Sequence, residues 1–99
     1  MSMKRRTIFL ENARRDLDAA FSYYEAKQRG LGYRFVDDVK RSVSMIEAFP
    51  YAWTNVAPNL HRCLLKTFPY ALLYRYDKDR EMVIIVAVAS LRQKPKHDP

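Results

Sequence analysis

The chain has 99 residues, of which 48% are hydrophobic and 13% aromatic, and its formal net charge is +7. This length allows one domain over residues 1–99, and the apolar content suffices for a hydrophobic core, which excludes an intrinsically disordered chain. The positive charge favours an anionic partner such as nucleic acid, an acidic protein or a membrane surface, although it also has the simpler reading of solubility.

The cysteine content and the N-terminal segment bear on where the protein works. Cys63 is the one cysteine, so no internal disulfide can form, which is typical of the reducing cytoplasm. The first apolar run is too short for a signal peptide, and no stretch approaches the ~20 apolar residues of a membrane-spanning helix. We therefore expect a cytoplasmic protein that does not enter a membrane, in which Cys63 is a core residue rather than a nucleophile.

The first half of the chain predicts a strand and two helices. Residues 5–10 are expected to form the strand, and Asn12 is placed to cap the helix that follows. Steps of three and four give that helix an apolar face made of Ala13, Leu17, Ala20, Phe21 and Tyr24. After a break at "RGLG", a second helix is expected from about Tyr33 to Phe49, and Pro50 ends it. So short a connection predicts a helical hairpin.

The second half predicts strands. Residues 51–59 are expected to form a loop, with Trp53 folded back onto the core. The runs "HRCLLKTF", "YALLYRY" and "MVIIVAVAS" then predict three strands with short connections. The last run is apolar on both sides, so we expect a central strand that is covered on both faces, one of them by the helices. The order β-α-α-β-β-β predicts an α+β fold, a helical hairpin on a small antiparallel sheet, with the first strand at its edge or beside the last strand.

The sequence offers little for metal or cofactor chemistry. His61 and His97 lie far apart and have no carboxylates at ligand spacing. Both glycines fall in the turn between the helices, which leaves none for a phosphate-binding loop. We therefore predict neither a metal nor a cofactor.

Basic residues carry the stronger signal, because they cluster on and after the predicted strands. They are Arg62, Lys66, Arg75, Arg92, Lys94 and Lys96. If the strand ends converge, these cations line one edge, near Tyr70, Tyr74 and Tyr76, which share one face of their strand. Such a surface can bind RNA through phosphates and stacked bases, or stabilise a phosphate during metal-free cleavage. The alternative is that the tyrosines belong to the core and the cations to a solvated rim.

Two further cations, Arg14 and Arg15, lie in the first turn of the first predicted helix. The helix dipole disfavours cations there, at a cost of only a few tenths of a kcal/mol on a solvated surface, where the usual scale of such effects is ~0.3–1 kcal/mol. A binding site for an anionic partner would explain them, and so would indifference to a cost this small.

The whole order of elements resembles the RelE/ParE superfamily of toxins from type II toxin–antitoxin (plasmid stabilisation) systems. The resemblance covers nearly all of the chain. It rests on "ARRDLDAAFSYYEAKQRGLGYRFVDDV", Pro50, "HRCLLKTFPYALLYRY" and "VIIVAVASLRQKP". It implies a RelE/ParE-like fold and a toxin held inactive by a cognate acidic antitoxin that wraps it, with a heterotetramer as one assembly. Arg62 matches the strand arginine of the family, while Phe68, Pro69, Tyr70 and Tyr74 match its hairpin signature.

The family implies two activities. RelE-like members cut mRNA in the ribosomal A site with several Lys or Arg side chains and often a Tyr or His that carries a proton, whereas ParE-like members poison DNA gyrase. This chain has "SLRQ" at residues 90–93 where relatives commonly carry a His and two basic residues, and its tail "KPKHDP" has no aromatic. Because Ser90 is a poor base, the ParE-like reading is favoured, and whether the chain is an enzyme stays open.

The alternatives are a ribosome-dependent mRNA endonuclease, or a degenerate toxin that only binds its antitoxin. Candidate catalytic residues of a nuclease are Arg62, Arg75 and Arg92. Candidates for binding an anionic partner or the antitoxin are Arg14, Arg15, Arg62, Lys66, Arg75, Arg92 and Lys94.

Overall fold

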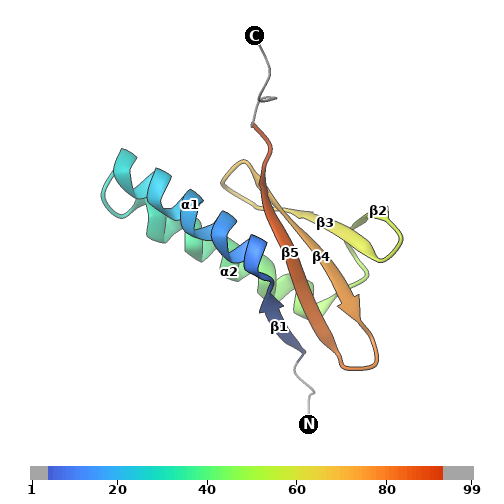
Figure 1. The fold of residues 1–99 in the computed structure, drawn as a ribbon. Coiled ribbons are helices and arrows are strands. Elements are labelled where there is room, and N and C mark those ends of the chain that lie inside the picture. Colours follow the sequence, from blue (N-terminus) through green and yellow to red (C-terminus); the bar gives the residue numbers. More distant parts are fainter. Residues whose placement is uncertain (1–4, 93–99) are drawn as a thin grey trace.

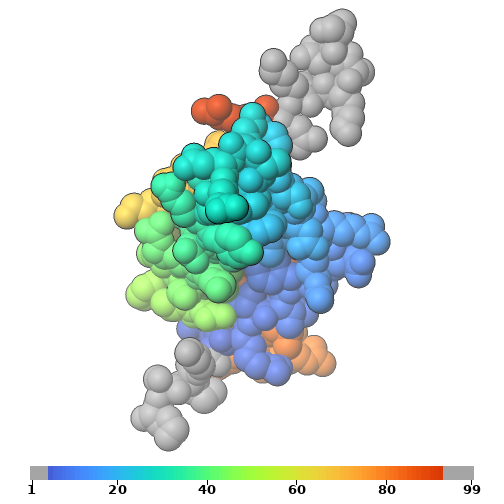
Figure 2. All heavy atoms as spheres, turned by 90° about the vertical axis from the view of Figure 1, so that its left-hand side faces the viewer, coloured from blue at the N-terminus to red at the C-terminus, as the bar shows by residue number. Residues whose placement is uncertain are grey.

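The computed structural model describes residues 5–92, in which two helices lie on one face of a five-stranded sheet (Figure 1). The elements follow in the order β1 (Arg6–Phe9), α1 (Glu11–Lys27), α2 (Leu31–Ala48), β2 (Thr54–Ala57), β3 (Leu60–Leu64), β4 (Tyr70–Asp77) and β5 (Met82–Ser90). Seen from the helix side (Figure 2), α1 in blue and α2 in teal to green fill most of the surface, and strands show only at its rim. The predicted α+β class and helical hairpin are confirmed.

The sheet has the strand order β1-β5-β4-β3-β2. β1 pairs with β5 in parallel, and the other neighbours pair antiparallel. β1 therefore lies both at the edge and beside the last strand, and its parallel pairing makes the sheet mixed. The helices cover one face of β5, and in residues 5–92 no second layer covers the other, so the expected cover on both faces is wrong.

Two boundaries in the first half differ from prediction. Asn12 does not cap α1: Leu10 holds the N-cap position without a side-chain bond. The Leu10 N–H donates to the Ile85 oxygen at 3.0 Å, so strand pairing continues to the residue at which the helix begins. α2 begins two residues earlier than expected, because the Glu25 carboxylate accepts hydrogen bonds from the Gly30 and Gly32 N–H groups at 2.8 and 2.9 Å.

The expected loop over residues 51–59 contains an unpredicted strand, β2. Its side chains are mostly exposed, and it pairs with β3 through an irregular register between Asn55 and Ala57. No apolar alternation marks such a strand, because neither of its faces is buried. Trp53 packs against the core as predicted.

The core lies between the helices and the sheet. Phe35 and Ile46 of α2 are fully buried, and Leu72, Tyr74 and Ile85 meet them from the sheet. Cys63 belongs to this core with 2% of its surface exposed, and burial raises the pKa of its thiol to about 11. The thiol is therefore neutral at physiological pH, in keeping with the expected core role.

Candidate functional site

The sheet face that the helices leave uncovered, here called the open face, carries two of the predicted arginines. His61 and Cys63 are buried under the helices, so Arg62 between them points the other way, and it is exposed. Arg75 lies in the same way between buried Tyr74 and Tyr76. The structure thus brings these two arginines to one face on neighbouring strands.

Toward the centre of the sheet the strand neighbours of these arginines are apolar, whereas on its outer side Arg62 pairs with Thr54 of β2. Arg62 is paired with Leu73, and Arg75 with Ile84. Ile8, on the same face of β1, is 43% exposed. Arg6 precedes Ile8 by two residues and therefore shares this face. Sequence reasoning missed Arg6, although its alternation with Thr7 and Ile8 was the signal. The open face is therefore defined by Arg6, Ile8, Arg62, Leu73, Arg75 and Ile84.

The tyrosines lie on the opposite, helix-facing side, so they do not accompany these arginines. Tyr74 is fully buried and donates its hydroxyl hydrogen to the Pro50 oxygen at 2.6 Å. Burial raises the pKa of Tyr74 well above its ordinary value. Tyr76 accepts a hydrogen bond from Arg5 Nε at 2.8 Å. Base stacking on these rings beside Arg62 and Arg75 is thereby excluded, and the core reading holds for Tyr74 and Tyr76, whereas Tyr70 is half-buried.

Arg92 is separated from the open face. A bulge in the β4–β5 pairing leaves Val86 without a partner, since Tyr74 pairs with Ile85 but Leu73 pairs with Ala87. The extra residue reverses the alternation of β5 beyond it, so Val88 and then Ser90 face the helices. Arg92 follows on that side. The structure therefore does not gather Arg62, Arg75 and Arg92 around one phosphate.

The surroundings of Arg92 form a groove of about 700 Å³ between α1, the β3–β4 connection and the end of β5. Tyr24 and Tyr70 line it with ring centroids 6.0 Å apart. Burial, and then Tyr70, raise the pKa of Tyr24. Asp16 also lines the groove, where its carboxylate accepts the Val88 N–H at 2.9 Å. Lys94 and Lys96 lie outside the described residues.

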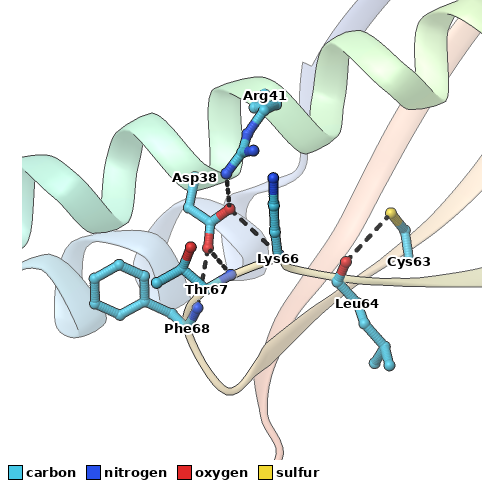
Figure 3. Close-up of polar contacts among 7 residues, drawn as sticks. All are labelled: Asp38, Arg41, Cys63, Leu64, Lys66, Thr67 and Phe68. Carbon is cyan, nitrogen blue, oxygen red and sulfur yellow. Dashed lines mark hydrogen bonds and ion pairs between the residues drawn. The ribbon is translucent and has the colours of Figure 1, made fainter.

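Lys66 does not join Arg62 either, because β3 ends at Leu64. In Figure 3 the Lys66 side chain rises toward α2 beside Arg41. The loop around it is held by Asp38, whose carboxylate accepts the backbone N–H groups of Lys66, Thr67 and Phe68 at 3.3, 2.8 and 3.0 Å. Arg41 adds an ion pair at 3.0 Å.

Asp38 is a residue that sequence reasoning missed. It is 3% exposed, and its burial by itself disfavours the charged carboxylate. The hydrogen bonds from Phe68, Thr67 and Lys66, with the charge of Arg41, outweigh that burial and hold the pKa of Asp38 below its ordinary value. The sequence signal for its burial was its position beside Val39, a residue of the apolar stripe of α2.

The first-turn arginines of α1 show no built site. Arg15 forms an ion pair with Glu11 at 3.2 Å, and both side chains are largely exposed. Arg14 is exposed as well. Glu11 in the same turn offsets the unfavourable contact of these cations with the helix dipole. The positions of Arg14 and Arg15 therefore need no anionic partner to explain them.

Two side chains that could transfer a proton, His61 and Asp77, lie within two residues of Arg62 and Arg75, and each is engaged by other groups. His61 points into the core, where it stacks on the Tyr74 ring at 5.0 Å. Asp77 is bound by Arg80: the Arg80 backbone N–H, and then its side chain, lower the pKa of Asp77. Within residues 5–92, no three His, Cys, Asp or Glu side chains gather as metal ligands, and no helix is long and apolar enough to cross a membrane.

Comparison with known proteins identifies relatives of this arrangement. Residues 7–95 match the family model described as the ParE toxin of the type II toxin–antitoxin system parDE. The chromosomal ParDE system from P. aeruginosa is similar in structure, with a TM-score of 0.75 and 15% sequence identity over 89% of this chain and 97% of that chain.

Two structures from E. coli are similar as well. The isolated RelE toxin has a TM-score of 0.66 and 16% identity over 91% of this chain and 87% of its own. For the intact RelBE toxin–antitoxin complex the TM-score is 0.67, and the sequence identity is 16% over 90% of this chain and 99% of that chain. At such identities the likeness shows the fold, and it confirms the RelE/ParE-like architecture expected from the sequence. No curated protein sequence matches this chain.

Proposed function

Because this chain belongs to the family of ParE toxins of type II toxin–antitoxin systems, we propose that it arrests growth by poisoning DNA gyrase through protein contacts. The observation that carries this proposal is the open face. Its arginines have apolar neighbours on the adjacent inner strands, and Asp77, the carboxylate on the same face of β4, is bound by Arg80. Such a surface is equipped to bind a protein, since arginine is enriched among the residues that dominate interface energetics, and surrounding apolar side chains help to exclude water from such contacts.

A cognate acidic antitoxin is the second proposed partner. The net charge of +7 supports an anionic partner, and the E. coli relative is a toxin–antitoxin complex. Neutralisation would occur in the cytoplasm, in a heterocomplex such as a heterotetramer.

Inhibition of purified gyrase tests the proposal. The chain, added in increasing amounts, is expected to inhibit supercoiling of relaxed plasmid at near-stoichiometric ratios, and an equal amount of the cognate antitoxin should restore it. Unimpaired supercoiling at a large molar excess of folded toxin would contradict the proposal.

The mRNA endonuclease alternative has weaker support, because Arg92 lies apart from Arg62 and Arg75, and because His61 and Asp77, their described titratable neighbours, are engaged by other groups. Pulse labelling after induction without the antitoxin separates the candidates. Early arrest of DNA synthesis is expected for gyrase, whereas early arrest of protein synthesis would favour the nuclease. Continued synthesis of both would favour a degenerate toxin that only binds its antitoxin.

A further inference from the structure

A smaller cavity of about 210 Å³ lies between α2, the segment before β2, and β3 with its connection to β4. Arg41 and Met45 line it from α2, Trp53 from the segment before β2, and Cys63 and Lys66 from β3 and its connection to β4. In Figure 3 the Arg41 and Lys66 side chains, and the Cys63 sulfur, are on the α2 side of the strand. The cavity is therefore lined by two cations, Arg41 and Lys66, and by the largely apolar side chains of Met45, Trp53 and Cys63.

Among the described residues, the lining of this cavity holds positive charge and no negative charge. None of its side chains is acidic, and the buried Cys63 thiol is neutral. The Asp38 carboxylate, which lies beside the lining residue Arg41, is engaged by Arg41 and by three backbone N–H groups. Lys66 gives Asp38 only its backbone N–H, and its ammonium group forms no ion pair within residues 5–92. Arg41 is 45% exposed, so its other guanidinium hydrogens can still donate.

Trp53 adds a donor that lacks an acceptor. Its Nε1 atom is buried and has no hydrogen-bond partner among the described residues. Buried donors in folded proteins are almost always paired, so the unpaired indole N–H of this cavity-lining residue leaves a donor for which the described residues supply no acceptor. Apart from the Ser42 hydroxyl, which can both donate and accept, the polar side chains that line the cavity are donors.

We propose that this cavity receives a carboxylate side chain, a Glu or an Asp, presented by an acidic partner protein. Arg41 and Lys66 hold the carboxylate, while Met45 and the Trp53 ring pack against the stem of the side chain and its apolar neighbour. The volume is below the ~300–1,000 Å³ of sites for whole small ligands, which suits a single anchoring side chain. The identity of the partner as an antitoxin rests on the proposed function, whereas the site itself does not.

Trp53 is the only tryptophan, so its fluorescence reports occupancy of the cavity directly. The probe is a capped ten-residue peptide with one central Glu-Leu pair in a Gly/Ser background, and its match carries Gln-Leu. Titration of the whole chain with the Glu peptide is expected to change Trp53 emission saturably in the millimolar range. The Gln peptide should bind at least about threefold more weakly, because it lacks the charge-assisted hydrogen bonds.

Lys66→Gln is the variant of choice, because the backbone N–H that serves Asp38 is retained. It should weaken binding of the Glu peptide roughly three- to tenfold. Lys78→Gln removes the same charge from the exposed β4–β5 turn and should leave the affinity unchanged. An equal loss in both variants would mean that only the net charge attracts the peptide, and would overturn the site.

Three other results would also overturn the proposal. Equal binding of the Glu and Gln peptides would indicate a merely apolar groove. A saturable change in Trp53 emission with a capped oligoribonucleotide, but not with the Glu peptide, would assign the cavity to nucleic acid. Unchanged Trp53 emission with both probes would mean that the cavity is not a binding site. Because this measurement uses neither gyrase nor cells, its failure is distinct from failure of the proposed function.

Discussion

Asp38 shows how a single buried charge can organise a loop that links two layers. Its carboxylate on α2 accepts hydrogen bonds from three consecutive residues of the β3–β4 connection and pairs with Arg41 (Figure 3). A buried carboxylate with so many donors is favourable only while all of them are present. The turn that begins the hairpin signature therefore depends on a helix 28 to 30 residues earlier in the chain.

Replacing Asp38 with Asn should destabilise the fold by about 2–3 kcal/mol, because an amide group accepts fewer hydrogen bonds and brings no charge to Arg41. Urea unfolding measures the difference. Asp37→Asn is the matched control, since Asp37 is exposed on the same helix, and its effect should stay within about 0.5 kcal/mol. Equal stability of the two variants would contradict the structural role of Asp38.

The same carboxylate predicts a dependence on pH. The pKa of Asp38 is lower in the folded chain than its ordinary value of 3.8, so the folded state binds this proton less readily than the unfolded state. Its contribution to stability is complete above that ordinary value and is lost as the pH falls through the folded pKa. The difference in unfolding free energy between the wild type and Asp38→Asn should therefore shrink below about pH 4. If this difference in unfolding free energy stayed constant from pH 6 to pH 3, the proposed effect of the Asp38 carboxylate on stability would be wrong.

Between elements, the closeness of α1 and α2 depends on Gly32. A Cβ atom at this position would lie 2.7 Å from the Phe21 oxygen and 2.8 Å from its ring. The backbone oxygen cannot turn aside as a flexible side chain can, so the helices would have to separate. Gly30 serves differently: its φ of 89° lies in the left-handed region, and open space surrounds it.

Gly32→Ala should therefore destabilise the chain by about 1–3 kcal/mol, despite the higher helix propensity of alanine. Thermal unfolding followed by circular dichroism gives the comparison. Gly30→Asn should be much milder, because asparagine tolerates the left-handed conformation. If Gly32→Ala proved neutral or stabilising, the close approach of the helices would not be essential.

For the whole molecule, the distribution of cations over two faces separates the mechanisms. Arg62 and Arg75 lie on the open face, and Arg92 lines the groove beside α1. A nuclease that used all three around one phosphate would lose activity with any of them. A surface that binds a protein would depend on the residues of that surface alone.

The double variant Arg62→Ala/Arg75→Ala is expected to weaken gyrase inhibition by about tenfold or more, and Arg92→Ala to retain it. Dose–response curves for supercoiling, with unfolding curves to confirm that each variant folds, make the measurement. Full inhibition by the double variant would remove the open face from the mechanism, and loss with Arg92→Ala alone would move the contact to the groove.

Local patterns in the chain were enough to predict the order of most elements. Apolar residues at helical spacing indicated α1 and α2, the glycines indicated the turn between them, and alternation indicated β3 and β4. These signals are local because each depends on which residues face a core. β2 carried no such signal, since it is exposed on both faces, and the start of α1 was decided by pairing with β5 rather than by Asn12.

The chemistry of the surfaces was decided by the tertiary structure. Alternation on β4 already placed Tyr70, Tyr74 and Tyr76 on one face, but only the helices show that this face is the core. One extra residue in β5 reverses its alternation, and thereby parts Arg92 from Arg62 and Arg75. A bulge and a buried carboxylate such as Asp38 act between segments far apart in sequence. Sequence spacing could therefore identify the candidate cations, but only the register of the sheet determines which of them share a face.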